Sequence, residues 1–450
     1  MSEEFTLTPS YVRAVLDGLE AGDGEEVRRL ITPLHAADIA DLIGLLRPLE
    51  RRALVDMLGD DLDPEVLSEL DEGIRDELLP HLEPSVVARA IEALNSDDAV
   101  YLLQDLEADQ QQAILEHVSD ADRAAVELAL QYPEYSAGRL MQREMITAPP
   151  FWTVGRLIDH MRAARDLPET FFEVFIIDPS FQPVGKVPLS RLMRSARTVP
   201  LDEIMDQDLT LIPATMEQEE AAYLFDQYHL ISAPVVDDAG RLVGMITVDD
   251  IVGVIQEENE EDIFALAGVG DEELSDSVLT TTRRRFSWLF VNLLTAIFAS
   301  MVIGFFSGTI EEIVALAVLM PIVASMGGNA GTQTLTVAVR ALATRDLTAA
   351  NAARIVYRET VVGGLNGMLF AIMMGGVAAV WFSNPPLGVV IGAAMIVNLL
   401  IAGCTGILIP LTLDRLGQDP AISSAVFLTT VTDVVGFFVF LGLASLVLLG

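Results

Sequence analysis

A single carboxylate, Asp433, lies inside a long apolar run near the C-terminus. The run covers residues 421–450, and Asp433 is its only charged residue. A segment of that length can cross a bilayer with some tilt. A carboxylate at membrane depth is costly, and helices tolerate one when it faces a bundle interior or a water-filled path. A cation is the natural compensation for such a charge, so Asp433 indicates a cation pathway.

The neighbours of Asp433 are consistent with a polar path. Thr429 and Gly436 share its helix face at i, i+4, i+7 spacing, so hydroxyl and carboxylate oxygens would form one strip beside a small residue. The alternative is a structural ion pair with a basic residue inside the bilayer. No apolar segment has Arg or Lys at its centre, and Arg340 lies at the end of one, which favours the path.

A second segment, residues 327–333 (GGNAGTQ), lies in another apolar run that also contains a proline. Glycine and proline weaken a helix, and freed carbonyls are tolerated at this depth only where they face protein or water. The backbone carbonyls of this segment and the side-chain amides of Asn329 and Gln333 are hard oxygen donors, which suit a hydrated Mg²⁺ or a similar ion. The alternative is packing alone, since Gly327 and Gly331 form a G-x-x-x-G motif.

Five apolar segments are long enough to span a membrane, and they cover residues 286–306, 313–341, 360–382, 387–413 and 421–449. Arginines lie before the first segment and in alternate loops after it, whereas the opposite loops, 307–312 and 383–386, contain no basic residue. Basic loops face the cytoplasm. The sequence therefore predicts a multi-pass protein of the inner (cell) membrane, with cytoplasmic N-terminal domains and the C-terminus outside.

Charge divides the chain into two unlike regions. Of the 66 acidic and 27 basic residues, residues 286–450 contain seven and five, so 59 and 22 remain in residues 1–285. This acidic region is unsuited to nucleic acid, which requires Lys and Arg against phosphate, and it should attract cations. The lone cysteine and the histidine spacing provide neither a disulfide framework nor a zinc motif. The sequence contains no nucleophile paired with a base and no phosphate-binding loop, so nothing in it indicates an enzyme.

The soluble region contains two kinds of repeat. Residues 1–135 have amphipathic helical spacing with a recurring leucine pattern, which predicts an acidic, solenoid-like helical domain. Residues 136–200 and 201–256 each contain an apolar–Met pair, a helix and two apolar strands joined by a turn. They resemble a tandem pair of α/β CBS domains, modules that often bind adenine nucleotides. The resemblance makes ATP a candidate ligand. The alternative is that the CBS pair of this chain binds no nucleotide.

The domain order and the membrane motifs together resemble the MgtE family of magnesium channels and transporters. The stretches GGNAGTQ, RALATRDL from Arg340, and TDVVG from Thr432 carry the resemblance within the membrane region. It implies a connector helix at 257–282, a five-helix transmembrane domain at 283–450 and a homodimer in membrane lipid. By position, the resemblance implies a pore ion site formed by Asp433 together with the backbone of Gly327 and Gly328 and with Asn329. The helix spacing described above adds Thr429 to this predicted site.

The family also implies regulatory magnesium sites between the cytosolic domains. The matching positions here are Asp249, Asp250, Glu257, Glu258, Glu260, Glu261 and Asp419. Clustered carboxylates repel one another when empty, and Mg²⁺ relieves that repulsion. A solvated helix face is the alternative for each of these acids.

The sequence thus predicts a Mg²⁺-selective channel or transporter for uptake, gated by cytosolic Mg²⁺. Two alternatives remain open: transport of another divalent cation (Co²⁺, Mn²⁺ or Zn²⁺), and a membrane-anchored CBS nucleotide sensor. An intramembrane acid and a glycine-rich segment favour transport, because an anchor requires neither.

Overall fold

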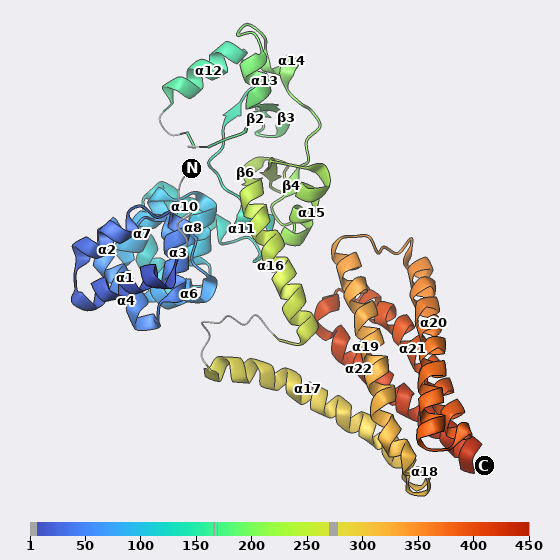
Figure 1. The fold of residues 1–450 in the computed structure, drawn as a ribbon. Helices are drawn as coiled ribbons and strands as arrows, with labels where there is room; N and C mark the ends of the chain where they lie inside the picture. Colours follow the sequence, from blue (N-terminus) through green and yellow to red (C-terminus); the bar gives the residue numbers. More distant parts are fainter. Residues whose placement is uncertain (1–6, 165–166, 169, 270–277, 450) are drawn as a thin grey trace. The chain divides into compact units, whose positions relative to one another are not determined.

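The computed structural model describes residues 7–164, 167–168, 170–269 and 278–449. The chain forms two compact units, Met1–Glu257 and Glu258–Gly450. Figure 1 shows their elements, which are N-terminal helices, two small α/β modules, and long helices towards the C-terminus. The predicted fold class is confirmed, including five helices with the length and composition of membrane spans among the described residues.

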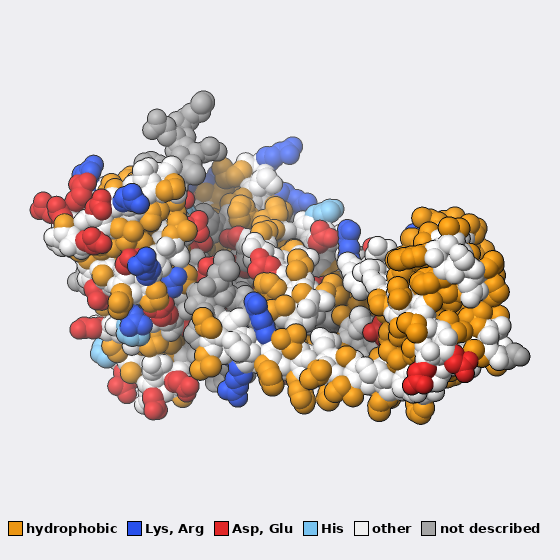
Figure 2. Space-filling model, turned by 60° about the horizontal axis from the view of Figure 1, so that its bottom comes forward, with side chains coloured by type: hydrophobic (Ala, Val, Ile, Leu, Met, Phe, Trp, Pro, Cys, Tyr) orange, Lys and Arg blue, Asp and Glu red, His pale blue; other side chains and the backbone are white. Residues whose placement is uncertain are grey.

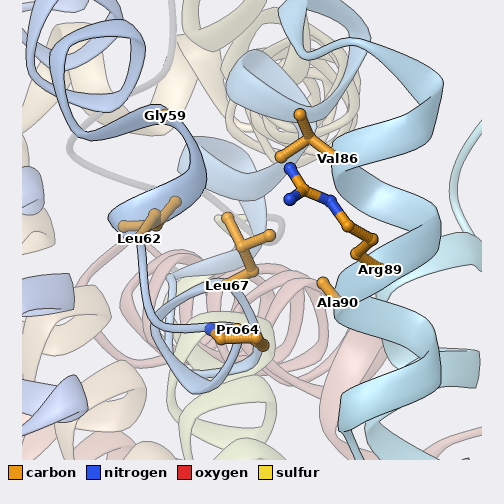
Figure 3. Close-up of a pocket in the computed structure, with 7 residues that line it drawn as sticks. All are labelled: Gly59, Leu62, Pro64, Leu67, Val86, Arg89 and Ala90. Carbon is orange, nitrogen blue, oxygen red and sulfur yellow. The ribbon is translucent and has the colours of Figure 1, made fainter.

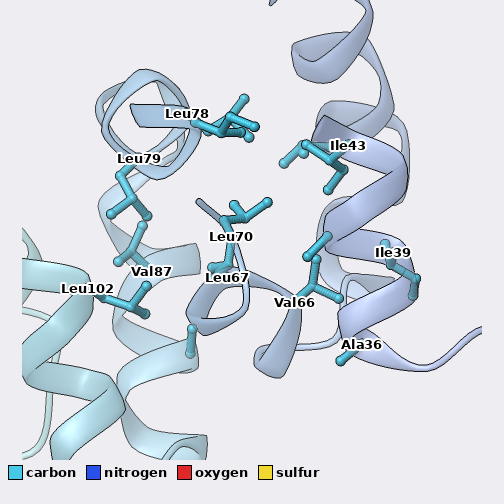
Figure 4. Close-up of a cluster of buried hydrophobic side chains, with 14 of the residues drawn as sticks. Ala36, Ile39, Ile43, Val66, Leu67, Leu70, Leu78, Leu79, Val87 and Leu102 are labelled. Atoms are coloured by element: carbon cyan, nitrogen blue, oxygen red, sulfur yellow. The ribbon is translucent and has the colours of Figure 1, made fainter. Parts of the chain in front are cut away.

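The N-terminal region is entirely helical in its described part. Its helices are α1 (Pro9–Ala21), α2 (Gly24–Ile31), α3 (Ala36–Leu45), α4 (Pro48–Leu58), α5 (Glu65–Ser68), α6 (Glu72–Leu78), α7 (Pro84–Ala93), α8 (Ser96–Leu103), α9 (Ala108–Leu115) and α10 (Asp120–Ala129), with 3₁₀ turns η1 (Gly59–Asp61) and η2 (Leu79–His81). Local capping starts several of them, because Asp23 and Ser119 accept backbone hydrogen bonds of 3.1 and 3.3 Å from their own first turns. Each helix contributes an apolar face to one core, in which Leu67, Leu78 and Val87 come from successive helices (Figure 4).

A buried arginine ties neighbouring helices of this region together. Arg75 on α6 is fully buried, and its guanidinium lies 4.2 Å from the ring centroid of Tyr101 on α8. It donates to the Tyr101 backbone oxygen at 3.1 Å and to Asp105 at 2.5 Å. Such a group is tolerated in a core only when paired and hydrogen-bonded, as it is here.

The two α/β modules have the same topology. The first contains β1 (Thr147–Ala148), α12 (Val154–Ala163), β2 (Glu173–Ile177), β3 (Pro183–Pro188) and α13 (Leu189–Arg194); the second contains α14 (Leu201–Ile204), β4 (Ile212–Pro213), α15 (Gln218–Tyr228), β5 (Ser232–Val236) and β6 (Leu242–Thr247). A short helix, α11 (Ala137–Leu140), precedes them. In each sheet the first two strands are parallel and the last two antiparallel. The second copy therefore repeats the first.

The apolar–Met pair that opens each copy packs on the sheet of the other copy. A Cβ built on Gly185 of β3 would lie 2.7 Å from the sulfur of Met205, and one on Gly244 of β6 would lie 2.8 Å from the sulfur of Met141. Both distances are shorter than the contacts of real Cβ atoms, and a backbone oxygen also lies 3.0 Å from the first Cβ and 2.9 Å from the second, so a larger residue at either position would require the packing to shift. The exchange explains why the Met recurs at the start of each copy.

A buried polar cluster also joins the two copies. Lys186, the only lysine in the chain, forms an ion pair of 3.0 Å with Glu173, and their side chains are only 18% and 7% exposed. Ser232 of the second copy donates a hydrogen bond of 2.5 Å to the same carboxylate.

The second copy continues into α16 (Val248–Ala267), so the predicted connector at 257–282 begins within an existing helix. The next helix, α17, starts at Val278, and the connector residues 270–277 lie outside the described residues.

The membrane unit is helical in its described part. Its helices are α17 (Val278–Phe305), α18 (Ser307–Glu312), α19 (Ala315–Ala343), α20 (Ala352–Trp381), α21 (Pro385–Arg415) and α22 (Pro420–Ala444), which ends in a π-helical turn, η3 (Ser445–Leu449). Apolar side chains cover these helices, whereas Asp and Glu gather on the N-terminal helices (Figure 2). Glycine contacts bring α20 and α21 together, since a Cβ on Gly363 would overlap the backbone oxygen of Leu399.

Candidate ion site and acidic clusters

Helix α19 presents a polar stripe on its exposed face. Its opposite face, which includes Val323, Gly327 and Leu335, is buried against the bundle. The exposed polar residues recur at helical spacing and are Ser325, Asn329, Thr332, Gln333 and Thr336. The sequence motif around Asn329 therefore contributes side chains to one surface of a predicted membrane span.

The glycine-rich segment does not interrupt the helix. Helix α19 is continuous through Pro321 and through residues 327–333, contrary to the expectation of freed backbone carbonyls. Tertiary packing explains the difference, because Gly327 and Gly331 lie on the buried face, where neighbouring helices approach closely. Gly328 and Asn329 lie outside that buried face.

Helix α22 places Asp433 beside a buried stripe. Thr432, Gly436 and Phe440 lie one helical turn apart and are buried, whereas Thr429 and Asp433 are partly exposed. The hydroxyl of Thr429 donates to the backbone oxygens of its own helix, at 3.0 and 3.1 Å. Its hydroxyl oxygen can still accept a hydrogen bond. Within the described part of the chain, no ion pair or hydrogen bond reaches the Asp433 carboxylate.

Helices α19 and α22 are in direct contact. Gly331 of α19 packs on Leu428 of α22, and a Cβ at this glycine would lie 2.9 Å from the leucine side chain. Leu335 and Val339 continue the contact along α19. The two helices that carry the predicted ion-site residues are therefore neighbours.

An acidic cluster forms within the first unit, at the start of α16. Burial raises the pKa of Asp250 to about 6, although hydrogen bonds from Thr247, one of them 2.6 Å long, oppose the shift. Burial and then the charge of Asp250 raise the pKa of Asp98 to about 6, and the same two causes raise the pKa of Asp97 well above its usual value. Burial therefore accounts for most of these shifts, and the charges of neighbouring carboxylates add to it.

Asp97 and Asp98 were not predicted as site residues. They lie on α8, far from α16 in sequence, and a solvated helix face was the simplest interpretation of their pattern. Asp249 is exposed, and Glu257 accepts a hydrogen bond of 3.4 Å from Gln218. Glu260 and Glu261 lie on the exposed side of the same helix.

A second acidic group lies within the membrane unit, outside the spans. Burial raises the pKa of Asp262 on α16 to about 6, and the charges of Asp419 and Glu258 add to the shift. Asp419 also starts α22, because it accepts a hydrogen bond of 2.7 Å from the backbone nitrogen of Ala421. Asp262 was not predicted, whereas Asp419 and Glu258 were. No group of three metal-ligating side chains is arranged to hold an ion among the described residues.

A small cavity in the N-terminal region contains none of the predicted site residues. It has a volume of about 140 Å³ and lies between η1, α5 and α7 (Figure 3). Apolar side chains such as Leu62, Leu67 and Val86 line it together with Arg89. The described residues that line it include no carboxylate and none of the acids of the two clusters.

Family models match three parts of the chain. One described as a divalent cation transporter (MgtE) matches residues 320–443, one for the MgtE intracellular N domain matches residues 34–135, and one for the CBS domain matches residues 201–257.

Curated relatives extend over most of the chain. The magnesium transporter MgtE of Thermus thermophilus is 32% identical over 365 residues, which are 80% of this chain and 79% of that protein. The magnesium transporter MgtE of Enterococcus faecalis is 32% identical over 317 residues, which are 70% of each chain.

A solved structure matches the first unit. The cytosolic domain of the Mg²⁺ channel MgtE in complex with ATP is 28% identical, with a TM-score of 0.50, and the match covers 54% of this chain and 99% of that one. Taken with the five candidate spans and the matching domain order, these similarities show that the chain belongs to the MgtE family.

Proposed function

We propose that this protein takes up Mg²⁺ through a path lined by α19 and α22, and that cytosolic Mg²⁺ closes it. The observation that supports this function best is the pairing of a polar stripe on α19 with the partly exposed Asp433 on the adjacent α22. Two relatives named as magnesium transporters support Mg²⁺ as the ion.

Membrane physics restricts what these polar faces contact. Hydrocarbon offers no hydrogen bonds, so a stripe of amides and hydroxyls faces water or protein and not acyl chains. A second copy of the chain, with its α19 and α22 against those of the first, would shield both stripes from lipid. In such a homodimer, two Asp433 carboxylates would flank one path.

The chemistry of the stripe suits a hydrated cation. Mg²⁺ releases its water reluctantly, and a hydrated ion presents only hydrogen-bond donors to its surroundings. A suitable path therefore offers acceptors. Asp433, the lone pairs of Thr429 and the amide oxygen of Asn329 are such groups. The membrane potential would drive a divalent ion inward by about 4.6 kcal/mol per 100 mV.

The acidic clusters supply the proposed gate. Burial is the main cause of the raised pKa values of Asp97, Asp98 and Asp250, and the charge of Asp250 adds to the shifts of the other two, so these carboxyls lie close enough to repel one another when ionised. Mg²⁺ bound by them, or by Asp262 and Asp419, would stabilise the compact arrangement. A ligand shifts a conformational equilibrium only through differential binding, and relief of this repulsion provides it.

Nucleotide binding is a separate proposal. The similar cytosolic structure was solved in complex with ATP, and the CBS pair of this chain has the two-copy fold that such binding uses. Calorimetric titration of ATP against the purified protein tests it, and an absence of heat at millimolar ATP would contradict it.

Flux measurements test the path. In liposomes with an inside-negative membrane potential, Mg²⁺ uptake by the Asp433→Asn or Asp433→Ala variant should fall at least about tenfold. A tenfold loss corresponds to about 1.4 kcal/mol of lost interaction between the protein and the ion. Asp414→Asn removes the same charge at an exposed site at the end of α21 and serves as the matched control. Normal uptake by the Asp433 variants would contradict the proposed path. An absence of flux from the wild-type protein would favour the nucleotide-sensor alternative, and faster uptake of Co²⁺, Mn²⁺ or Zn²⁺ would change the assigned ion.

A further inference from the structure

Asn398 lies where α19, α21 and α22 meet, and its side chain is fully buried. Its Nδ2 donates a hydrogen bond of 2.9 Å to the backbone oxygen of Val323 on α19. A Cβ built on Gly327 would overlap this amide, and a Cβ on Gly436 of α22 would lie 2.9 Å from Nδ2. The amide on α21 thus fills the space left by a glycine on each of the two other helices.

This junction lies close to the predicted ion-site residues on both helices. Gly436 follows Asp433 by three residues, a rise of about 4.5 Å along the helix. Gly327 precedes Asn329 by two residues, a rise of about 3 Å. The contact with Asn398 is therefore within one helical turn of each predicted ion ligand.

The side-chain amide of Asn398 includes one buried atom whose lack of a hydrogen bond reduces the stability of the protein. Among the described residues, no group donates a hydrogen bond to Oδ1 of Asn398, although this atom is buried. An unpaired buried acceptor is costly, and an apolar side chain of the same branched shape would avoid that cost. The contacts that the amide does make fix α21 against α19 and determine how closely α22 approaches.

We propose that Asn398 is a positioning residue of the ion path, which holds α19 and α22 at the spacing that discriminates among divalent cations. The inference rests on the proposed function, since it requires both helices to line the path. Acceptors on both helices hold the hydration shell at once, so a change in their spacing alters the fit of one hydrated ion relative to another. Asn398 acts through Asn329 and Asp433 and does not itself contact the ion.

Replacement of the amide tests the proposal directly. The full-length Asn398→Leu variant, in phosphatidylethanolamine–phosphatidylglycerol liposomes, should change the ratio of Mg²⁺ to Mn²⁺ uptake by at least about threefold, the effect of a typical interhelical hydrogen bond in a membrane. Its melting temperature in detergent should not fall. Asn366→Leu makes the same change on the exposed face of α20 and should alter neither quantity.

Rescue by a second substitution gives an independent test that does not depend on the leucine variant. Gly436→Ala should reduce uptake, because its Cβ meets Asn398, and Asn398→Ala in the same chain should restore it by removing the amide. Gly331→Ala introduces an equally close contact, 2.9 Å, but with Leu428. Asn398→Ala should therefore not rescue Gly331→Ala.

The outcomes separate this inference from the proposed function. An unchanged Mg²⁺ to Mn²⁺ ratio in a folded Asn398→Leu protein would overturn the inference, as would equal rescue of both glycine variants. If Asp433→Asn still abolished uptake in that assay, the proposed ion path would stand even though the inference about Asn398 had failed. If the wild-type protein transported neither ion, the proposed function itself would fail.

Discussion

Two acids of this chain meet opposite environments at the scale of the single residue. Glu173 is buried between the α/β modules with a lysine and a hydroxyl as partners. Asp433 lies in a membrane span and has no such partner among the described residues. A buried carboxylate with a built-in counter-charge is a structural group, whereas one without it requires a cation from elsewhere. This contrast is the physical reason for proposing Asp433 as the charged ligand of the ion path and Glu173 as a structural group.

The structural assignment of Glu173 predicts an asymmetric response to mutation. Lys186→Met leaves the buried Glu173 carboxylate without its cationic partner and should destabilise the first unit by about 3 kcal/mol. Replacement of both residues, Glu173→Val with Lys186→Val, should come close to the wild-type stability, because the paired charges gain little over apolar packing. Urea unfolding followed by circular dichroism measures both. Equal loss in the single and double variants would show that the ion pair itself stabilises the joint.

Asp98 predicts a pH dependence of stability. Burial and Asp250 raise its pKa to about 6, above the value of an unfolded chain, so the folded state binds more protons between about pH 4 and 6. Stability should therefore fall as the pH rises through this window and level off above it. Asp98→Asn should stabilise the protein at pH 7.5 by up to about 2 kcal/mol and weaken the dependence. Asp109→Asn, an exposed acid on α9, is the control. Unfolding midpoints without Mg²⁺ at several pH values provide the measurement, and an unchanged slope in Asp98→Asn would contradict the cluster.

At the scale of the element, hydrophobicity predicted the spans well and the charged helix ends less well. The first and third spans were predicted at 286–306 and 360–382 and were observed at Thr281–Phe305 and Ala352–Trp381. Arg354, Arg358 and Glu359 explain the later predicted start of the third, because charges end an apolar run but do not end a helix. Helix α19 differs in another way, since packing against α21 and α22 keeps its glycine-rich segment helical.

The part of the candidate site that was predictable is the part encoded in local pattern. Asp433, Thr429 and Asn329 are polar residues in apolar segments, so they can be recognised as unusual from the sequence alone. Asn398 has the same local signature, but its importance comes from two glycines on other helices, which no local pattern reveals.

At the scale of the whole chain, the acidic cluster depends on contacts between distant segments. Asp98 on α8 meets Asp250 on α16 only because the N-terminal helices and the second α/β module belong to one compact unit. Sequence spacing does not reveal contacts between such distant residues. Asp250 was therefore predicted as a site residue, whereas Asp97 and Asp98 were not.

The acidic cluster predicts that Mg²⁺ slows amide hydrogen exchange in the helices that carry it. If the cluster binds Mg²⁺, the backbone amides of α8 and of the first turns of α16 should exchange with deuterium more slowly in millimolar Mg²⁺ than in NaCl of equal ionic strength, since a ligand that binds only the compact state stabilises it. The effect should be about tenfold or more in exchange rate when the ion is about tenfold above its dissociation constant. The Asp98→Asn, Asp250→Asn double variant should lose the effect, because neutral amides neither repel one another nor attract the ion strongly. Helix α1, remote from these acids in sequence, serves as the internal control within the same protein. Equal protection of α1 and α8 would indicate general screening of the negative charge and would remove the cluster from the proposed gate.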